Sequence, residues 1–239
     1  MKRNRTNTAT EPQPAEKASP NGAEVSLLNA AEALFADKEF DAVTTRDIAN
    51  RAKVNLALVH YYFGAKEKLF RAVLERRIEE LSHRRLQLLK DRRHSSPAIP
   101  IAQIVEAFVL PLLEFATAGN RGWRNYIRLN GRVASSDKYI KLAGDLYDPA
   151  ANVFIEEIAR TLHAASRRDV EWGYLFMVSA MSCAFAGGGR IERLSSGKGK
   201  SSDLGEAYDV LIPFISAGLE ASGRRLRTRH RERPTSELV

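Results

Sequence analysis

The sequence predicts an all-α protein with two helical parts, and three observations carry that prediction. Apolar residues recur at helical spacing along most of residues 24–220, and residues that cap helices precede several of these stretches. No segment alternates apolar and polar residues as a convincing strand would, and no internal repeat is present. With 239 residues, 44% of them hydrophobic, the chain is long enough to bury a sizeable core.

The formal net charge of +8 indicates an anionic partner, and its location along the chain is uneven. Residues 24–70 hold six basic and seven acidic residues, so the basic excess lies in residues 1–23, 71–96 and 223–239. Residues 1–22 have almost nothing to bury and are predicted to form a disordered basic tail. Residues 223–239 are predicted to form a disordered Arg-rich tail.

Two classes of protein are excluded by composition. Charges interrupt every apolar stretch before membrane-spanning length, and the N-terminal residues lack the apolar middle of a signal peptide. The single cysteine, Cys183, cannot form an intrachain disulfide, which fits a reducing compartment. We therefore expect a cytoplasmic protein without a membrane partner.

The first two helices are predicted by an apolar stripe and a cap. From Glu24 onward the stripe gives one helix a face to bury, and it consists of Leu27, Leu28, Ala31, Leu34 and Phe35. Thr44, followed three residues later by Asp47, makes a capping box that opens a short second helix. Ile48, Ala49 and Ala52 would be the inward-facing residues of this second helix.

A third helix and a tight turn complete the first part. Asn55 is a good N-cap for a helix from Leu56 to about Phe63, and Gly64 can supply the left-handed residue that ends it. Two short helices joined by so tight a turn, packed under a first helix, predict a helix-turn-helix domain over residues 23–70.

The larger part, residues 71–222, is predicted to be helical throughout. A long helix begins at Lys66 and presents one apolar side, formed by Leu69, Phe70, Val73, Leu74, Ile78 and Leu81. A second stripe runs from Ile101 to Ala116 with Pro111 inside it, which predicts a kink. Helices over about 123–133 and 138–162 follow, the latter kinked near Pro149.

Residues 170–186 and 204–220 carry the most apolar late helices, separated by a predicted flexible loop rich in Gly and Ser. Together they offer more apolar surface than one small helical domain readily covers. Two such helices from each of two subunits would form a four-helix interface. We therefore expect a homodimer through these two segments.

The stretch F-DAVTTRDIANRA-KVN-LALVHYYF-GAKEKLF-RAVLERR resembles the N-terminal DNA-binding domain of the TetR family of bacterial repressors. In that family the third helix usually ends in an L-Y-x-H-F-like run, and a G-S-K-E-x-L-F-like sequence starts the fourth. The resemblance covers residues 24 to about 77. The chain departs from the pattern in carrying Lys53 for the turn glycine, Ala65 for the serine cap, and Val59 and His60 for the usual Leu and Tyr.

The resemblance implies a contact with a double-stranded DNA operator. A helix in the major groove reads bases through its first turn and is positioned on phosphates through its ends. The predicted contacts are Thr44, Thr45 and Arg46 with one phosphate, Asn55, Leu56 and Ala57 with base edges, and His60, Tyr61, Tyr62 and Lys66 with the opposite strand's backbone. An ordinary core with an aromatic rim is the alternative for the HYYF row.

The resemblance also implies a pocket for a small-molecule effector among the later helices. Polar and aromatic residues spread through that part are the candidates to line it, namely Trp123, Tyr126, Arg128, Tyr147, Trp172 and Phe176, with Asn152 and Cys183 in the same group. Plain core is the alternative for each of them. For Cys183, packing in an apolar run is the preferred interpretation.

No pattern predicts a metal, a cofactor or a catalytic site. The five histidines lack metal-ligand spacing, the GGGR and GKGK runs do not follow strands, and no nucleophile has a partner in view. We expect a ligand-responsive transcriptional repressor, not an enzyme, that binds a near-palindromic operator as a dimer and is released by a small apolar or amphipathic effector. A nonspecific DNA-coating protein driven by the tails and a small helical enzyme are the alternatives.

Overall fold

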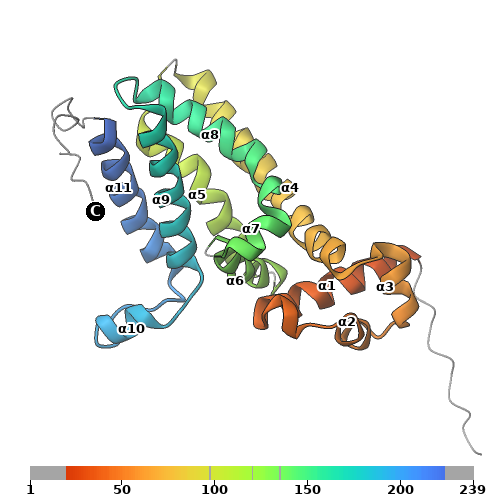
Figure 1. Ribbon diagram of the computed structural model, residues 1–239. Coiled ribbons are helices and arrows are strands. Elements are labelled where there is room, and N and C mark those ends of the chain that lie inside the picture. The colour runs from red at the N-terminus through yellow and green to blue at the C-terminus, as the bar shows by residue number, and fades with distance from the viewer. Residues whose placement is uncertain (1–19, 97, 120, 135, 224–239) are drawn as a thin grey trace, which may run out of the picture.

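Helices form all the longer elements of the computed structural model, which describes residues 20–96, 98–119, 121–134 and 136–223 (Figure 1). No strand occurs within those ranges, and the predicted all-α fold class is confirmed. The elements are α1 (Pro20–Asp37), η1 (Phe40–Ala42), α2 (Thr45–Ala52), α3 (Leu56–Phe63), α4 (Lys66–Ser95), α5 (Ile101–Thr117), α6 (Arg121–Ala134), α7 (Asp137–Ala143), η2 (Gly144–Leu146), α8 (Asp148–Thr161), α9 (Arg167–Phe185), α10 (Arg190–Leu194) and α11 (Leu204–Gly223).

The two predicted tails lie almost entirely outside the part of the chain that the structure describes. The Arg-rich tail predicted from residue 223 lies outside it except for Gly223, the last residue of α11. The N-terminal tail predicted over 1–22 also lies outside it up to residue 19. Residues 20–22 belong to α1, which begins before the expected Glu24.

The first three helices gather at one end of the molecule, and α4 leads from them into the remaining helices (Figure 1). An aromatic cluster ties this head together, because the rings of Phe35, Phe40 and Phe70 lie 5.1 to 5.7 Å apart. Offset and edge-on ring pairs of this kind add to the free energy gained from burial alone. The cluster joins α1, η1 and α4, so the long helix starts from inside the core of the head.

The predicted caps of the short helices are confirmed. Thr44 accepts a hydrogen bond from the backbone N–H of Asp47 at 3.1 Å, and Asp47 accepts from the backbone N–H of Thr44 at 3.0 Å. Asn55 accepts from the backbone N–H of Ala57 at 2.9 Å and caps α3. These bonds satisfy N–H groups that have no partner inside their own helix, so both helices begin at defined residues.

The two turns of the head use backbone with positive φ. Lys53, between α2 and α3, has φ 56° and ψ 40°, the left-handed conformation expected for the residue that replaces the turn glycine. Gly64, after α3, has φ 69° and ψ −70°, which a residue with a side chain adopts only under strain. Ala65, the N-cap of α4, makes no side-chain cap.

The later helices pack beside one another into a larger body around α5 (Figure 1). One wall of its core comes from α5, whose buried residues include Ile104, Val105, Phe108 and Leu112. The helix continues through Pro111 to Thr117, and the kink expected at Pro111 stays a prediction. The apolar side predicted for α4 is confirmed, because all six of its residues are buried.

Two predictions for the body are wrong. The helix expected over 138–162 is divided into α7, η2 and α8, and Pro149 lies in the first turn of α8. A proline in the first turn needs no N–H partner, so Pro149 begins a helix where a kink within one was expected. The loop expected between the last two helices contains α10, which is held by Glu192 accepting from the backbone N–H and the hydroxyl of Ser201, both at 2.7 Å.

Candidate nucleic-acid interface and ligand pocket

One side of α3 faces solvent, while the other packs into the head. Val59 and Phe63 are buried, four residues apart on the inner side. The exposed residues are Asn55, Ala57, His60 and Tyr61, and 79% of the Tyr61 surface is accessible. Leu56 is half-buried at the start of the helix. The predicted base-contacting residues therefore lie together at the N-terminal end of one ridge.

The aromatic row differs from residue to residue. The His60 ring nitrogen Nδ1 lies 3.1 Å from the carbonyl oxygen of Gly64 and helps to close the end of α3. Tyr61 projects outward and meets the half-buried Tyr62 edge-on, with ring centroids 5.1 Å apart. Only Phe63 belongs fully to the core. A plain core with a rim accounts for Phe63 but gives no reason for the exposure of Tyr61.

The start of α2 lies at the same end of the molecule. Thr44 and Arg46 are exposed and Thr45 is half-buried. Hydrogen bonds from the side chain and backbone of Thr44 lower the pKa of Asp47, so this carboxylate is ionised at neutral pH and keeps the capping box closed. The hydroxyl of Thr44 already donates to Asp47 at 2.7 Å. This hydroxyl therefore has only acceptor lone pairs left, and a phosphate, which is itself an acceptor, needs donors. The backbone N–H groups of the first turn and Arg46 are the better donors.

Lys66 is turned toward the protein. Its ammonium group donates to the carbonyl oxygens of Phe40 and Val43, both at 2.9 Å, and lies 4.2 Å from the centre of the Phe40 ring. Two of its three donors therefore hold the chain that leads into α2, and one remains. The main contacts of Lys66 therefore hold the head together, and only its third N–H is available for the predicted phosphate contact.

A cavity of about 360 Å³ lies in the body, lined by residues of helices α4 to α9. Tyr126 and Tyr147 line it, as proposed from the sequence, along with apolar side chains from each wall. The lining includes Ile78, Leu81, Arg85, Phe108, Val133, Ile140, Asp145, Asp148, Tyr174, Val178 and Met181. A mostly apolar wall with a few polar groups is typical of small-molecule sites.

The other six pocket candidates lie outside the cavity wall. Trp123 is buried and stacks on Phe115 with ring centroids 4.1 Å apart, so it is core. Trp172 and Phe176 are exposed on α9. Asn152 is also exposed and outside the cavity wall. Helical spacing shows which side of a helix is apolar, but not whether a cavity, a neighbouring helix or solvent faces it.

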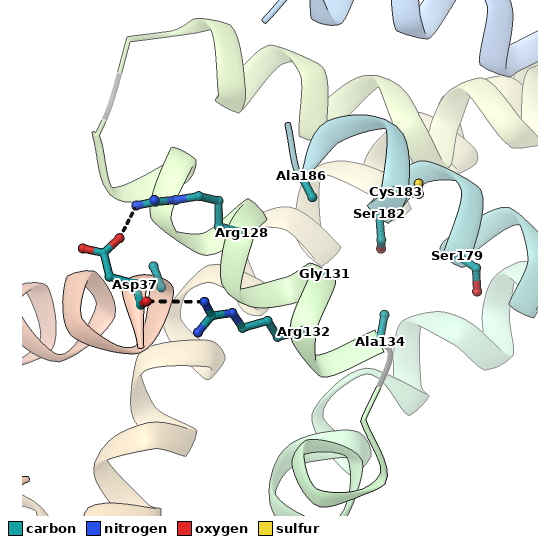
Figure 2. Close-up of a pocket in the computed structure, with 10 residues that line it drawn as sticks. Asp37, Arg128, Gly131, Arg132, Ala134, Ser179, Ser182, Cys183 and Ala186 are labelled. Atoms are coloured by element: carbon teal, nitrogen blue, oxygen red, sulfur yellow. Dashed lines mark hydrogen bonds and ion pairs between the residues drawn. The ribbon is translucent and has the colours of Figure 1, made fainter. Parts of the chain in front are cut away.

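Arg128 lies at a separate groove between α1, α6 and α9, shown in Figure 2. It forms an ion pair with Asp37 at 2.9 Å, and Arg132 donates to the carbonyl oxygens of Phe35 and Asp37. These bonds fasten the end of α1 to α6. Cys183 is exposed at this groove, so the expectation that it packs inside an apolar run is wrong.

The residue missed by sequence reasoning is Arg85. It lies on α4 within the spacing Ile78, Leu81, Arg85, Leu89, all of which are buried. An arginine on the apolar side of an amphipathic helix was the available signal. Its Nε donates to the carbonyl oxygen of Phe108 at 2.7 Å, and the guanidinium lies 3.7 Å from the centre of the Phe108 ring.

Three tyrosines surround the polar part of the cavity. Burial raises the pKa of Tyr126 and of Tyr174 to about 12, and burial raises the pKa of Tyr147 well above its usual value. All three are therefore neutral at physiological pH and can donate hydrogen bonds. The Tyr147 hydroxyl is buried close to Tyr126, but no described residue lies at a distance and angle that would make a hydrogen bond with it.

Helix α7 touches both the cavity and the head. The Tyr139 hydroxyl accepts from the backbone N–H of Phe40 at 3.0 Å and donates to Glu39 at 2.7 Å. Beside it, Lys138 pairs with Asp41 and lowers the pKa of that carboxyl. The next residue, Ile140, lines the cavity. A movement of α7 at the cavity would therefore act on the same turn that Lys66 holds.

Large apolar side chains remain exposed on α9 and α11, which pack against each other. They are Trp172, Leu175, Phe176, Val210 and Phe214, each between 45% and 69% accessible. Large exposed apolar patches mark interaction surfaces. Separately, none of the described helices is both long enough and apolar enough to cross a membrane.

A helix-turn-helix head joined by one long helix to a larger helical body defines a DNA-binding transcription regulator. Two family models match the chain: residues 27–73 match bacterial regulatory proteins of the tetR family, and residues 106–218 match the tetracyclin repressor-like C-terminal domain. The chain belongs to the TetR family.

Curated relatives resemble this chain over a limited stretch. The HTH-type transcriptional repressor Rv3405c of Mycobacterium tuberculosis (strain ATCC 25618 / H37Rv) and the HTH-type transcriptional regulator Mb3439c of Mycobacterium bovis are each 42% identical over 69 residues. The match covers 28% of this chain and 37% of each relative's length, well under two thirds.

Solved structures resemble the chain over most of its length. A TetR-like regulator from Rhodococcus sp. RHA1 is 20% identical with a TM-score of 0.53, covering 83% of this chain and 96% of that one. FadR from Bacillus subtilis, solved in complex with stearoyl-CoA, is 12% identical with a TM-score of 0.57, covering 81% and 98%. At this identity the likenesses show the fold.

Proposed function

We propose that this regulator is a ligand-responsive repressor that binds a near-palindromic operator as a homodimer and leaves it when a small apolar or amphipathic effector binds. It would act in the cytoplasm by binding, without catalysis. Residues 23–70 would form the DNA-binding domain and residues 71–222 the domain for effector binding and dimerisation. The exposed ridge of α3, with Tyr61 at its outer edge, is the observation that carries the proposal.

On DNA, α3 would lie in the major groove. Leu56 and Ala57 offer apolar surface to thymine methyl groups, and Asn55 keeps its amide N–H groups for a base edge, since its oxygen caps the helix. A phosphate on one strand would be bound at the start of α2 by the backbone N–H groups of its first turn, the Thr45 hydroxyl and Arg46, while Thr44 would contribute by capping the helix. The other strand's backbone would meet His60, Tyr61, Tyr62 and the third N–H of Lys66.

The exposed apolar side chains of α9 and α11 support the dimer. Pairing these helices with those of a second copy would remove them from water and form a four-helix interface over residues 170–186 and 204–220. Two heads in one dimer would meet two half-sites of the operator, which is why the operator would be near-palindromic.

The cavity supports an effector of modest size, because about 360 Å³ is near the lower end of the usual range for ligand sites. Stearoyl-CoA, the ligand of FadR, is an amphipathic example from a protein of similar fold. The effector would act by binding more tightly to the conformer whose heads are wrongly spaced for DNA. Helix α4 and the contact of Tyr139 with Phe40 are the physical connections from cavity to head.

Gel shifts with the promoter beside the protein's own gene test the proposal. The full chain should bind this promoter more tightly than random duplex at moderate salt, and Tyr61→Phe should weaken binding to both by removing one phosphate contact. Leu194→Ala, which shortens another exposed side chain on α10, is the matched control. Equal affinity for promoter and random duplex would contradict sequence-specific regulation.

A second comparison separates this function from nonspecific coating by the tails. A chain lacking residues 1–19 and 224–239, which leaves α1 and α11 whole, should bind the promoter more weakly and with a shallower dependence on salt, because fewer phosphate contacts release counterions. It should still prefer the promoter over random duplex. Loss of all binding would favour the coating function.

A further inference from the structure

Arg85 differs from every other arginine on α4. The six others each pair with a carboxylate: Arg71 with Asp145, Arg76 and Arg77 with Glu32, Arg84 with Glu114, Arg92 with Glu106, and Arg93 with Glu157. Arg85 is the most deeply buried of the seven, with 7% of its surface accessible, and no described carboxylate pairs with it. A buried charge is costly unless it is paired, so this exception needs an explanation.

The contacts that Arg85 makes leave part of its guanidinium available. Its Nε donates to the carbonyl oxygen of Phe108, and one terminal nitrogen lies 3.6 Å from the sulfur of Met181, a weak acceptor. A guanidinium has five N–H donors in a fixed fork, and these two contacts use two of the five. Arg85 also lines the cavity, so the remaining donors lie where a ligand would be.

The groups around Arg85 match one kind of ligand atom. Tyr126, Tyr147 and Tyr174 line the same cavity and lie near enough to Arg85 to feel its charge. As neutral phenols they donate hydrogen bonds, and the Tyr147 hydroxyl has none of its own at acceptable geometry among the described residues. A guanidinium beside several hydroxyl donors is a site for a negatively charged oxygen group.

Carboxylates on the cavity wall decide where that group would lie. Asp145 and Asp148 line the cavity and are exposed to solvent, and Asp145 already accepts from Arg71 at 2.6 Å. These negative charges disfavour an anion beside them. An anionic ligand would therefore place its charge at the buried end, on Arg85, and its apolar body along Ile78, Leu81, Val133 and Val178.

We propose that the effector is an organic carboxylate with an apolar body, and that the guanidinium of Arg85 is its specificity-determining contact. The proposal rests on the effector site described under the proposed function and names the chemistry of its ligand. A carboxylate fits the planar fork of arginine, whereas a neutral ligand of the same shape would leave the buried charge without a partner.

Matched pairs of probes test this proposal on the full chain. Dodecanoate is compared with dodecanamide, and 2-naphthoate with 2-naphthamide, by thermal shift and by titration calorimetry. At least one carboxylate should raise the melting temperature, because a ligand bound to the folded state stabilises it. That carboxylate should bind at least about tenfold more tightly than its amide, as expected for hydrogen bonds to a charged group.

Substitutions assign the preference to Arg85. In Arg85→Met the carboxylate should lose its advantage over the amide, and in Arg85→Lys part of it should remain because the charge is kept without the fork. Arg84→Met is the matched control, since the neighbouring Arg84 pairs with Glu114 of α5 and does not line the cavity, so its loss should leave the preference unchanged. Circular dichroism of each variant establishes that it is folded.

The proposal is overturned if no carboxylate raises the melting temperature, if the amides bind as tightly, or if a folded Arg85→Met retains the preference. Operator binding by Arg85→Met without any probe is measured alongside. Suppose that Arg85→Met binds the operator as tightly as the unmodified protein does, and that neither protein prefers a carboxylate to its amide. The proposal of an anionic effector is then wrong, and the proposed regulator function stands.

Discussion

At the scale of single residues, Lys53 shows how a turn can be formed by a residue that does not favour it. With φ 56° it adopts the left-handed conformation, in which Cβ crowds the following carbonyl oxygen. The turn survives because Lys53 and Val54 donate backbone hydrogen bonds to Asn50 and Ala49, at 3.2 and 3.1 Å. The spacing of α2 and α3, and so of the two predicted DNA-contacting helix ends, depends on this turn.

Lys53→Gly should therefore stabilise the protein. Glycine adopts positive φ without the Cβ clash, so the free energy of unfolding should rise by about 1 kcal/mol. Urea denaturation followed by circular dichroism measures the change. Arg51→Gly, two residues earlier and inside α2, should lower the stability by about 1 kcal/mol. A loss of stability in Lys53→Gly would mean that the lysine side chain contributes more than its backbone strain costs.

The buried tyrosines predict how stability changes at alkaline pH. In the folded protein the pKa of Tyr126 and of Tyr174 is about 12, above the ordinary value of 10.0, chiefly because of burial. Below pH 10 both folded and unfolded chains keep these protons, so stability does not depend on them. Between pH 10 and 12 only the unfolded chain releases them, so the free energy of unfolding should fall as the pH rises.

Spectrophotometric titration of phenolate absorbance, with denaturation at each pH, measures this effect. Tyr126→Phe should remove one phenolate from the last part of the titration and make the loss of stability above pH 10 less steep. If Tyr126 ionised with the first tyrosines, its hydroxyl would be in contact with water, and the cavity would be more open than the structure shows.

At the scale of elements, the joint between α1 and α4 depends on a buried carboxylate. Glu32 is 1% exposed and accepts from Arg76 at 2.7 Å and from Arg77 at 2.9 Å. Arg77 also lies over the ring of Trp123, 5.0 Å from its centre. One carboxylate therefore holds the long helix against the first helix of the head and places both beside α6.

Glu32→Gln should destabilise the protein strongly. It leaves two guanidinium groups near the core without a charge partner, and breaking such a buried pair costs about 3 kcal/mol or more. Glu79→Gln, on the exposed side of the same long helix, is the control and should change stability by less than about 0.5 kcal/mol. Thermal and urea denaturation of both variants compare them. Similar stability for both would mean that α1 and α4 are held by apolar packing alone.

The elements also show what could be predicted from sequence. The period of apolar residues predicted α4 and its buried side, and the capping residues predicted where α2 and α3 begin. The same period could not predict the break before Pro149, because proline is compatible both with a kink and with the first turn of a new helix.

The cavity was less predictable for a related reason. Its wall is assembled from helices distant in sequence, so composition identified Tyr126 and Tyr147 but also gave Trp123, Arg128, Trp172 and Phe176, which lie elsewhere. Arg85 is not aromatic, and it stands alone as a charged residue on the apolar side of α4. A charge at an apolar position of a regular stripe is the more informative signal, since burying it needs a reason.

At the scale of the whole molecule, the head lies at one end and α11 lies at the other, with α9 packed beside α11 (Figure 1). The cavity lies between them, against α4 and α9 together. In the proposed dimer, a change in the cavity would therefore act both on the pairing of the two subunits and on the position of each head. Repression by the proposed dimer would require these two surfaces to be coupled, and the cavity wall includes both α4, which leads into the head, and α9, which carries part of the exposed apolar surface.

The proposed dimer gives the last prediction. Phe214 and Val210 are 69% and 66% exposed on α11, and Trp172 and Phe176 lie on the adjoining α9. Phe214→Asp would bury a charge at the centre of the interface, and the loss of such an aromatic anchor typically costs 2 kcal/mol or more of binding free energy. Light scattering after size-exclusion chromatography should find the unmodified chain at twice its 26.7 kDa and the variant shifted toward 26.7 kDa. Operator affinity should fall with it, because one head cannot hold two half-sites.

Leu194→Asp, 71% exposed on α10, is the control and should remain dimeric. A Phe214→Asp protein that stays dimeric and binds the operator fully would place the interface on another surface.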